Sequence, residues 1–295
     1  MLKVVHTQGN KSLATVYVAE LSDGACIECV ESVQPPVPRE DKWVLIVSTL
    51  KGCPVSCAIC DAGGAYAGPL TALEILAQID LLVHSRYPDG ALPIQRLKIQ
   101  FARMGDPAFN PAVIEVLEQL PGRYEVPRLM PCISTIAPVG CDNFFQQLLA
   151  VKRSLYADGD FQMQFSLHTT CEDERRKLVP ARCWSFARMG AWSREFFRPG
   201  DRKITLNFAP PVGFPLDPQA LLPYFSPDSH LVKLTPINPT AASRKAGLTG
   251  AIDANAPRPS AAIAQRFQDA GYETILSIGE LEENQIGSNC GMYVG

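Results

Sequence analysis

Three cysteines in one short loop constrain this chain more than any other feature. Cys53, Cys57 and Cys60 lie in the run from Lys51 to Cys60 with a C-x3-C-x2-C spacing. Three thiolates in one loop can bind three irons of a [4Fe-4S] cluster and leave the fourth iron open, whereas electron-carrier ferredoxins normally complete the cysteine set. An open iron can chelate a small molecule and pass it an electron, so the spacing predicts a catalytic cluster. The alternatives are three free thiols, or a zinc site completed by a distant ligand.

Composition limits the class of protein and its compartment. The chain has 295 residues, of which 46% are hydrophobic, enough for a sizeable core. It contains no apolar run of about 18 residues, so we expect no membrane span. The start, Met1 to His6, does not resemble a signal peptide. An oxygen-sensitive cluster in a chain with ten cysteines predicts a reducing, cytoplasmic location.

Charge gives no global signature of nucleic-acid binding, because the formal net charge is −3. Locally, the stretch from Arg175 to Lys203 is rich in arginine and lysine. Such a stretch can contact phosphates. It can equally be a solvated helix face with interspersed acids, and we favour that interpretation.

Beyond residue 40, strand-like and helix-like segments alternate. Strands are indicated at residues 44–47, 97–101, 161–167, 204–208, 231–235 and 272–278, and Thr71 to Glu74 forms a capping box that opens a helix. This alternation predicts an α/β fold with a parallel sheet, a partial (βα)6 barrel open on one side. Chemistry in parallel barrels belongs at the carboxyl ends of the strands, and the cluster loop follows the first strand.

The first 40 residues have a different pattern. Residues 14–20 and 27–33, joined by the turn Ser22-Asp23-Gly24, predict a β-hairpin. A proline-rich segment, residues 35–38, follows it. We therefore expect two parts: an N-terminal hairpin extension with its linker (residues 1–40), and a barrel with a C-terminal loop (residues 41–295).

Small and polar residues follow several of the predicted strands. Gly105 lets the backbone approach a ligand closely, and the Asp106 carboxylate can accept a hydrogen bond from an ammonium group. A lone cysteine lies in a polar loop near the C-terminus. The strand-end segments are Met104 to Pro107, Ser134-Thr135, Ser166-Leu167-His168 and Asn238, and the C-terminal loop is Ser288 to Gly291.

The cysteine spacing is typical of radical S-adenosylmethionine (SAM) enzymes, whose open iron binds the amino and carboxylate groups of SAM. From about Thr15 onward, the ordered motifs resemble the RlmN/Cfr-type radical SAM methyl synthases, which methylate an adenine ring carbon in ribosomal RNA and sometimes transfer RNA. The resemblance implies two cofactors, a [4Fe-4S] cluster and SAM. It also implies that SAM is bound by Gly105, Asp106, Ser134, Ser166, Leu167, His168 and Asn238.

Two catalytic residues follow from the same resemblance. Ile27-Glu28 matches the family segment whose glutamate acts as the base, and Asn289-Cys290-Gly291 matches the segment whose cysteine carries the methyl group. In the family, one SAM methylates the cysteine, and a radical made from a second SAM activates that methyl group for addition to the ring. Taken singly, Glu28 also fits a solvated strand residue, His168 a satisfied core residue and Cys290 a buried apolar group.

The chain departs from the family pattern in three places. Ile46 stands where the family has a second cysteine, seven residues before Cys53, and an isoleucine cannot attack a sulfur to release the product. Substitute thiols could come from Cys26, Cys29, Cys132 or Cys171. Asp106 replaces a glutamate. Only about a dozen residues precede the hairpin, where the family has a helical accessory domain that helps to hold RNA.

Three functions remain open from the sequence. The first is a radical SAM methyltransferase that uses Cys290 to methylate RNA or a small heteroaromatic molecule, with an electron donor of the flavodoxin or ferredoxin type. The second is a radical SAM enzyme that uses the deoxyadenosyl radical directly, for rearrangement, oxidation or ring formation. The third, a non-catalytic descendant, is disfavoured because all three loop cysteines are present.

Overall fold

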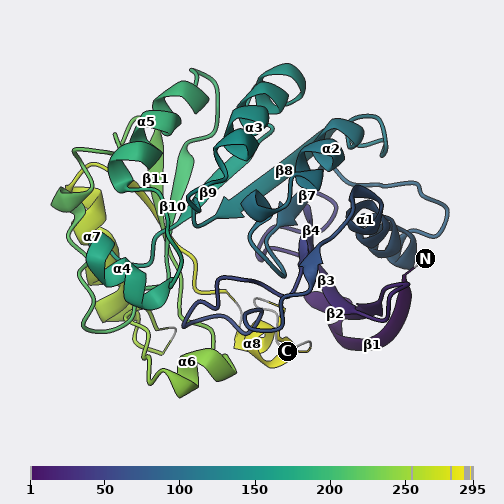
Figure 1. Ribbon diagram of the computed structural model, residues 1–295, viewed down its shortest axis with the longest axis horizontal. Helices are drawn as coiled ribbons and strands as arrows, with labels where there is room; N and C mark the ends of the chain where they lie inside the picture. Colours follow the sequence, from purple (N-terminus) through teal and green to yellow (C-terminus); the bar gives the residue numbers. More distant parts are fainter. Residues whose placement is uncertain (1, 254, 280, 289–292, 294–295) are drawn as a thin grey trace.

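The computed structural model describes residues 2–253, 255–279, 281–288 and 293. Within these residues, ten strands form one curved sheet in the order β1-β2-β3-β4-β7-β8-β9-β10-β11-β12. Helices lie along the outer side of the parallel part of this sheet (Figure 1). A separate two-stranded sheet pairs β5 (Leu50–Lys51) with β6 (Gly68–Pro69).

The parallel part of the sheet confirms the predicted α/β architecture. Its neighbouring strands are all parallel, from β4 to β12. They are β4 (Trp43–Val47), β7 (Arg96–Phe101), β8 (Arg128–Thr135), β9 (Gln162–Ser166), β10 (Ile204–Phe208), β11 (His230–Leu234) and β12 (Glu273–Leu276). In the described part of the chain, β12 pairs with β11 alone, as expected for a partial barrel.

The helices and short 3-10 turns fall between and after these strands. The predicted capping box opens α1: the Thr71 hydroxyl accepts from the Glu74 amide at 3.2 Å, and the Glu74 carboxylate accepts from the Thr71 amide at 2.7 Å. The helices are α1 (Ala72–Arg86), α2 (Ala112–Gln119), α3 (Asp142–Leu155), α4 (Glu172–Leu178), α5 (Phe186–Phe196), α6 (Ala241–Lys245), α7 (Pro257–Asp269) and α8 (Leu281–Ile286). The 3-10 turns are η1 (Pro107–Phe109) and η2 (Pro218–Ala220).

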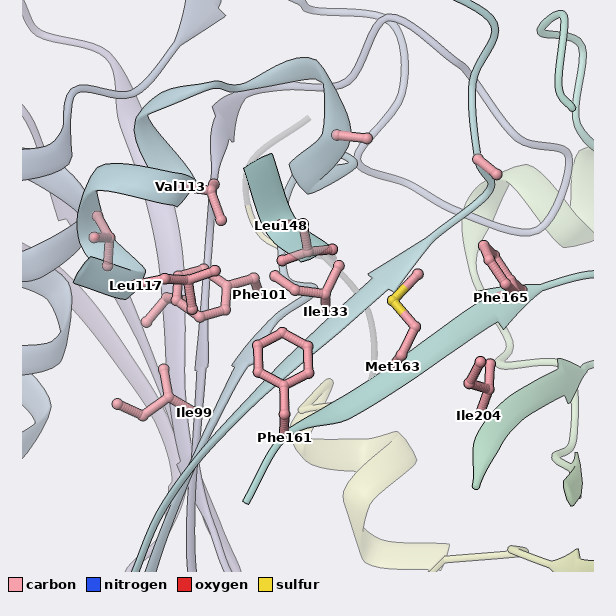
Figure 2. Close-up of a cluster of buried hydrophobic side chains, with 14 of the residues drawn as sticks. Ile99, Phe101, Val113, Leu117, Ile133, Leu148, Phe161, Met163, Phe165 and Ile204 are labelled. Atoms are coloured by element: carbon pink, nitrogen blue, oxygen red, sulfur yellow. The ribbon is translucent and has the colours of Figure 1, made fainter. Parts of the chain in front are cut away.

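The hydrophobic core lies between the sheet and the helices. Ile99 and Phe101 of β7 are fully buried and point toward Val113 and Leu117 of α2 (Figure 2). Side chains on the neighbouring strands, including Ile133, Met163 and Ile204, continue this apolar face. Because successive strand residues point to opposite faces, the residues between them face the inside of the barrel.

The N-terminal part of the chain contains one strand more than the predicted hairpin. The hairpin is present as β2 (Ala14–Glu20) and β3 (Cys26–Ser32), paired antiparallel. An additional strand, β1 (Lys3–Asn10), pairs with β2, and β3 pairs with β4 opposite Ile46. The sequence pattern missed β1 because most of its residues are exposed and it lacks an apolar alternation. The division of the chain at residue 40 stays a prediction.

No helix in the described ranges is long and apolar enough to cross a membrane.

Candidate functional site

The loop that carries the three cysteines is held by its own backbone and by neighbouring elements. It connects β5 to β6. Gly52 at its start has φ +72°, and a Cβ there would lie 2.3 Å from the Ala65 carbonyl oxygen, so only glycine fits. The Ala58 amide donates to the Leu178 carbonyl at the end of α4, at 2.8 Å. The cysteine positions are therefore fixed by contacts outside the loop as well as inside it.

Cys53, Cys57 and Cys60 line one cavity. Burial raises the pKa of Cys53 to about 11, and the pKa of Cys57 is also raised, first by burial and then by the neighbouring thiols. Such thiols become thiolates only when a positive centre compensates their charge, as iron does.

The arrangement of the three thiols distinguishes a cluster from a single metal ion. In the described part of the chain, no three His, Cys, Asp or Glu side chains are arranged to hold a single metal ion. In a cubane cluster each thiolate binds a different iron, so three sulfurs around one shared cavity fit that group.

The cavity has a volume of about 1000 Å³ and runs into the interior of the barrel. The structure brings together residues that are far apart in the sequence. Besides the three cysteines, its lining contains the predicted SAM-segment residues Gly105, Asp106, Ser134, Ser166, His168 and Asn238. Leu167 is the exception, because its side chain is fully buried in the hydrophobic core.

Asp106 is buried and tied into the third strand end. Its carboxylate accepts from the Thr135 hydroxyl at 2.7 Å, from the Ile136 amide at 2.7 Å and from the Ala108 amide at 2.9 Å. Burial raises its pKa to about 6 despite these hydrogen bonds. Gly105 beside it has φ +85°, and a Cβ there would lie 2.4 Å from the Leu50 side chain. This segment therefore presents backbone to the cavity.

His168 is a buried, neutral histidine with a left-handed backbone, φ +68°. Burial, followed by the nearby Arg175 charge, lowers its pKa to about 3. Its Nδ1 accepts from the Ala209 amide at 3.2 Å, so Nε2 carries the proton. The residue thus offers a hydrogen-bond donor in the cavity wall.

Glu28 is buried in an ion pair that the sequence did not reveal. The Arg103 guanidinium donates to one oxygen of the Glu28 carboxylate, from Nε at 2.9 Å and from Nη2 at 2.5 Å. The side chains of Arg103 and Glu28 are 1% and 0% exposed. Arg103 also lines the cavity. Its only sequence signal is its place at a strand end, two residues before Gly105.

Cys290 lies outside the described residues. Described residues on both sides of it contact the Glu28–Arg103 pair. Arg103 donates to the carbonyl oxygens of Gly287 and Ser288 at 2.8 Å, and the Tyr293 amide donates to the other Glu28 oxygen at 2.8 Å. Gly287, Ser288 and Tyr293 are therefore anchored on Glu28 and Arg103.

Ile46 lines the cavity, at the position where the family resemblance led us to expect a thiol. Of the four cysteines considered as substitutes, Cys29 is fully buried in the main core, and Cys26 and Cys171 are half-buried. Cys132 is buried on β8. Gln100 of β7 pairs with Ile46 on one side and with Cys132 on the other, so the two residues lie at the same level of the sheet, two strands apart. Cys132 thus shares the inward face of the barrel with Ile46.

The basic stretch from Arg175 to Lys203 is not a uniform cationic face. Arg176 pairs with Asp173 and Lys177 with Glu174, both on α4 and both exposed. Arg175 is buried behind the cavity, where its Nη2 donates to the carbonyls of Ile136 and Ser166 at 2.8 Å. These observations agree with a solvated helix face that carries one structural arginine.

Several known proteins are similar to this chain in sequence or in fold. No protein-family model matches the chain. A probable dual-specificity RNA methyltransferase RlmN from Thermus thermophilus is 26% identical over 194 residues, covering 65% of this chain and 51% of that protein. The RlmN of Desulfitobacterium hafniense is 26% identical over 98% of this chain and 78% of its own length. The probable RlmN of Microcystis aeruginosa is 31% identical over 170 residues, covering 56% of this chain and 44% of that protein.

The chain spans about half the length of the first of these relatives, 51%. Among solved structures, a radical SAM methyltransferase from Sphaerobacter thermophilus matches with a TM-score of 0.76 and 21% identity, covering 98% of this chain and 80% of that one. At this identity the match concerns the fold. The chain thus resembles the RlmN/Cfr-type radical SAM RNA methyltransferases in sequence and has the fold of a radical SAM protein.

Proposed function

We propose that this chain is a radical SAM methyltransferase that methylates an unactivated ring carbon of an adenine-like or other heteroaromatic substrate. The observation that carries the proposal is the shared cavity, which joins three cysteines of one loop to residues from four strand ends. The anchoring of both flanks of Cys290 on the Glu28–Arg103 pair supports the same function.

In this proposal Cys53, Cys57 and Cys60 hold a [4Fe-4S] cluster. The bound cluster supplies the electron that cleaves SAM. The Gly105 backbone, Asp106 and the inward-facing residues of the other strand ends hold the SAM molecule and exclude water. His168 donates from Nε2 and Ser134 from its hydroxyl, whereas Leu167 contributes only its backbone. These donors and acceptors are already in place in the folded protein, and a reactive cofactor needs such fixed contacts to be held in one orientation.

Cys290 is the proposed methyl carrier and Glu28 the proposed base. Glu28 receives the proton that leaves the ring carbon once the carbon carried on the Cys290 sulfur has bonded to it. The remaining carbon–sulfur bond would then be broken by a second thiol that forms a disulfide with Cys290, for which the candidates are Cys26, Cys29, Cys132 and Cys171. Arg103 keeps the Glu28 carboxylate compensated and oriented, because it holds one carboxylate oxygen and leaves the other toward Tyr293. The proposed electron donor is of the flavodoxin or ferredoxin type. The relatives are described as RNA methyltransferases, so RNA is a substrate class to test beside small molecules.

The test is anaerobic cluster reconstitution followed by incubation with SAM and dithionite. We expect mass spectrometry to show a methyl group on the Cys290 peptide, together with release of 5′-deoxyadenosine. Cys290→Ala removes the methyl acceptor. Cys141→Ala, at the start of α3 and outside the proposed machinery, is the matched control and keeps the methylation. Deoxyadenosine production without methylation of Cys290 in the wild-type protein contradicts the proposal.

A second function is favoured by one observation, the apolar Ile46 at the cavity wall. Without a thiol there, the disulfide-forming release step is unavailable from this position. A radical SAM enzyme that acts directly on its substrate has no need of that thiol. In that case Cys290→Ala retains full product formation, which separates the two functions in the same assay.

A further inference from the structure

The inner face of the barrel is polar where parallel barrels are usually filled by branched apolar side chains. On β7, buried Leu97, Ile99 and Phe101 face the helices, and Lys98 and Gln100 line the cavity. The other strands contribute polar groups to the same lining: Gln162, Gln164, Thr205, Asn207 and Lys233. The barrel interior is therefore built to contact a polar ligand.

Lysines are concentrated in one part of this lining. Lys42 directly precedes β4, Lys98 lies on β7 and Lys233 on β11, and the exposed Arg202 stands at the edge of the group. Lys98 and Lys233 lie close enough to Lys42 to act on it: burial first, and then these and other neighbouring cations, lower the pKa of Lys42 to about 8. The pKa values of Lys98 and Lys233 are also lowered by burial.

The lysines have few compensating groups. Lys98 is 7% exposed. Neither it nor Lys233 makes an ion pair or a side-chain hydrogen bond with any described residue. Lys42 donates to the neutral Gln34 side chain at 2.6 Å. Three carboxylates among the described residues line the cavity. Asp106 accepts from Thr135 and the Ile136 amide, Glu273 lies 3.9 Å from Lys203, and Glu283 acts on Lys233 without forming an ion pair with it. A buried cation without a partner is costly, so a site that retains one is organised for an anion.

We propose that Lys42, Lys98 and Lys233 bind an anionic oxygen group, a phosphate or a carboxylate, of a small-molecule substrate inside the barrel. The proposal rests on the proposed function in one respect: the other end of that substrate is the ring that meets SAM near the cluster loop. The cavity of about 1000 Å³ is at the upper end of small-molecule sites, which leaves room for a substrate beside SAM. Lys98 is reached only from within the barrel, which favours a small anion over a folded RNA.

The test measures anion binding directly, without turnover. Inorganic phosphate and succinate are titrated into the cluster-loaded protein by calorimetry, with potassium chloride at matched ionic strength as the blank. We expect phosphate or succinate to bind, and Lys98→Met to weaken that binding at least tenfold. Lys177→Met, which removes an exposed lysine of α4, is the matched control and leaves it unchanged. Equal anion binding by wild type and Lys98→Met, or none by either protein, overturns the proposal.

Two further measurements distinguish anion binding by Lys98 from a structural role and from RNA binding. Without an added anion, Lys98→Met should melt at the same temperature as wild type or higher, because it removes an unpaired buried charge. A melting temperature lowered by several degrees would mean a structural role and overturn the proposal. The second measurement is the binding of a single-stranded RNA decamer. If that binding depends on Lys98 and is not displaced by phosphate or succinate, the ligand is RNA and the small-molecule proposal is overturned.

The outcome is independent of the methyl-transfer proposal. Lys98→Met should still acquire the cluster and still methylate Cys290, since both steps precede substrate binding. If the wild-type protein binds phosphate but does not methylate Cys290, the methyltransferase proposal fails and the anion site stands. If it methylates Cys290 but binds neither phosphate nor succinate, only the anion-site proposal fails.

Discussion

Glu28 and Arg103 form the most deeply buried ion pair among the described residues, and they come from segments 75 positions apart. Arg103 uses its remaining donors on the carbonyls that precede Cys290. One arginine thus compensates the proposed base and positions the segment of the proposed methyl carrier. At the residue scale, the site depends on this pair as a unit, since either partner alone is an uncompensated buried charge.

Glu28→Gln should therefore lower the free energy of unfolding by about 3–5 kcal/mol, the usual cost of leaving one member of a buried pair unmatched. The double variant Glu28→Gln/Arg103→Met should recover part of that loss, because no charge then remains buried. Urea denaturation followed by circular dichroism gives the values. The control is Glu20→Gln in the exposed Lys3–Glu20 pair, which should cost less than about 1 kcal/mol. Equal losses in Glu20→Gln and Glu28→Gln would contradict this account.

His230 gives a pH dependence of stability. It is 1% exposed, and burial lowers its pKa to about 4 from an ordinary value of 6.5. The unfolded chain therefore binds a proton between these values and the folded chain does not. The stabilisation is complete above pH 6.5 and is lost as the pH falls toward 4, by roughly 1.4 kcal/mol per unit of pKa.

His230 Nδ1 lies 3.1 Å from the Ser226 carbonyl oxygen. The variant His230→Asn keeps a hydrogen-bond donor near that carbonyl and has no group that titrates. Its urea midpoint should fall less than that of wild type between pH 7 and pH 4. His84→Asn is the matched control, because exposed His84 makes a similar bond to the Asp80 carbonyl, at 2.8 Å. An unchanged pH profile in His230→Asn would assign the acid sensitivity to other groups.

At the scale of secondary-structure elements, the cysteine loop is joined to the segment after β11. The Asp61 carboxylate accepts from the first amides of α6, Ala241 and Ala242, each at 2.8 Å. The Thr240 hydroxyl donates to the Ile59 carbonyl at 3.3 Å. These bonds bring the loop beside Asn238, whose carbonyl accepts from the Thr240 amide. Two elements about 180 positions apart thus form one wall of the cavity.

Asp61→Ala should cost about 1 kcal/mol of stability, as the loss of a helix cap does. It should also speed the loss of cluster absorbance near 400 nm, because the loop is released on the side of Cys60. The matched control is Asp217→Ala, which removes the carboxylate that caps η2 through the Gln219 amide. We expect a similar stability loss and no change in cluster retention for that control. Equal cluster lifetimes in the two variants would refute the coupling.

At the scale of the whole molecule, the curved sheet encloses the cavity and brings every proposed SAM contact except the Leu167 side chain to its wall. A ligand that bridges several strand ends stabilises the folded state by mass action. Binding at 100 times the dissociation constant contributes about 2.7 kcal/mol, which corresponds to a rise in melting temperature of roughly 5 °C for a chain of this size.

SAM should therefore raise the melting temperature of the cluster-loaded protein by about 5 °C. It should have little effect on Cys53→Ala, because that variant lacks a ligand for the proposed cluster, to which the amino acid end of SAM would bind. Cys141→Ala should respond as wild type does. Differential scanning fluorimetry under anaerobic conditions measures all three proteins. An equal response of Cys53→Ala to SAM would separate SAM binding from the cluster.

The sequence by itself determined six strands of the parallel sheet and the spacing of the three loop cysteines. Local signals sufficed for the cysteine spacing, the capping box at Thr71 and the alternation of β7, because each depends on neighbours within a few residues. The apolar residues of β7 predicted the strand, and the structure then placed Lys98 and Gln100 on its inner face.

The tertiary structure alone decided which distant side chains meet. It paired Arg103 with Glu28, placed Leu167 in the core rather than at the cavity, and gathered Lys42, Lys98 and Lys233 around one space. It also added β1 as a strand that lacks an apolar pattern of its own. The physical reason is that strand order and sheet curvature set these distances, and both arise from non-local pairing that no short run of sequence encodes.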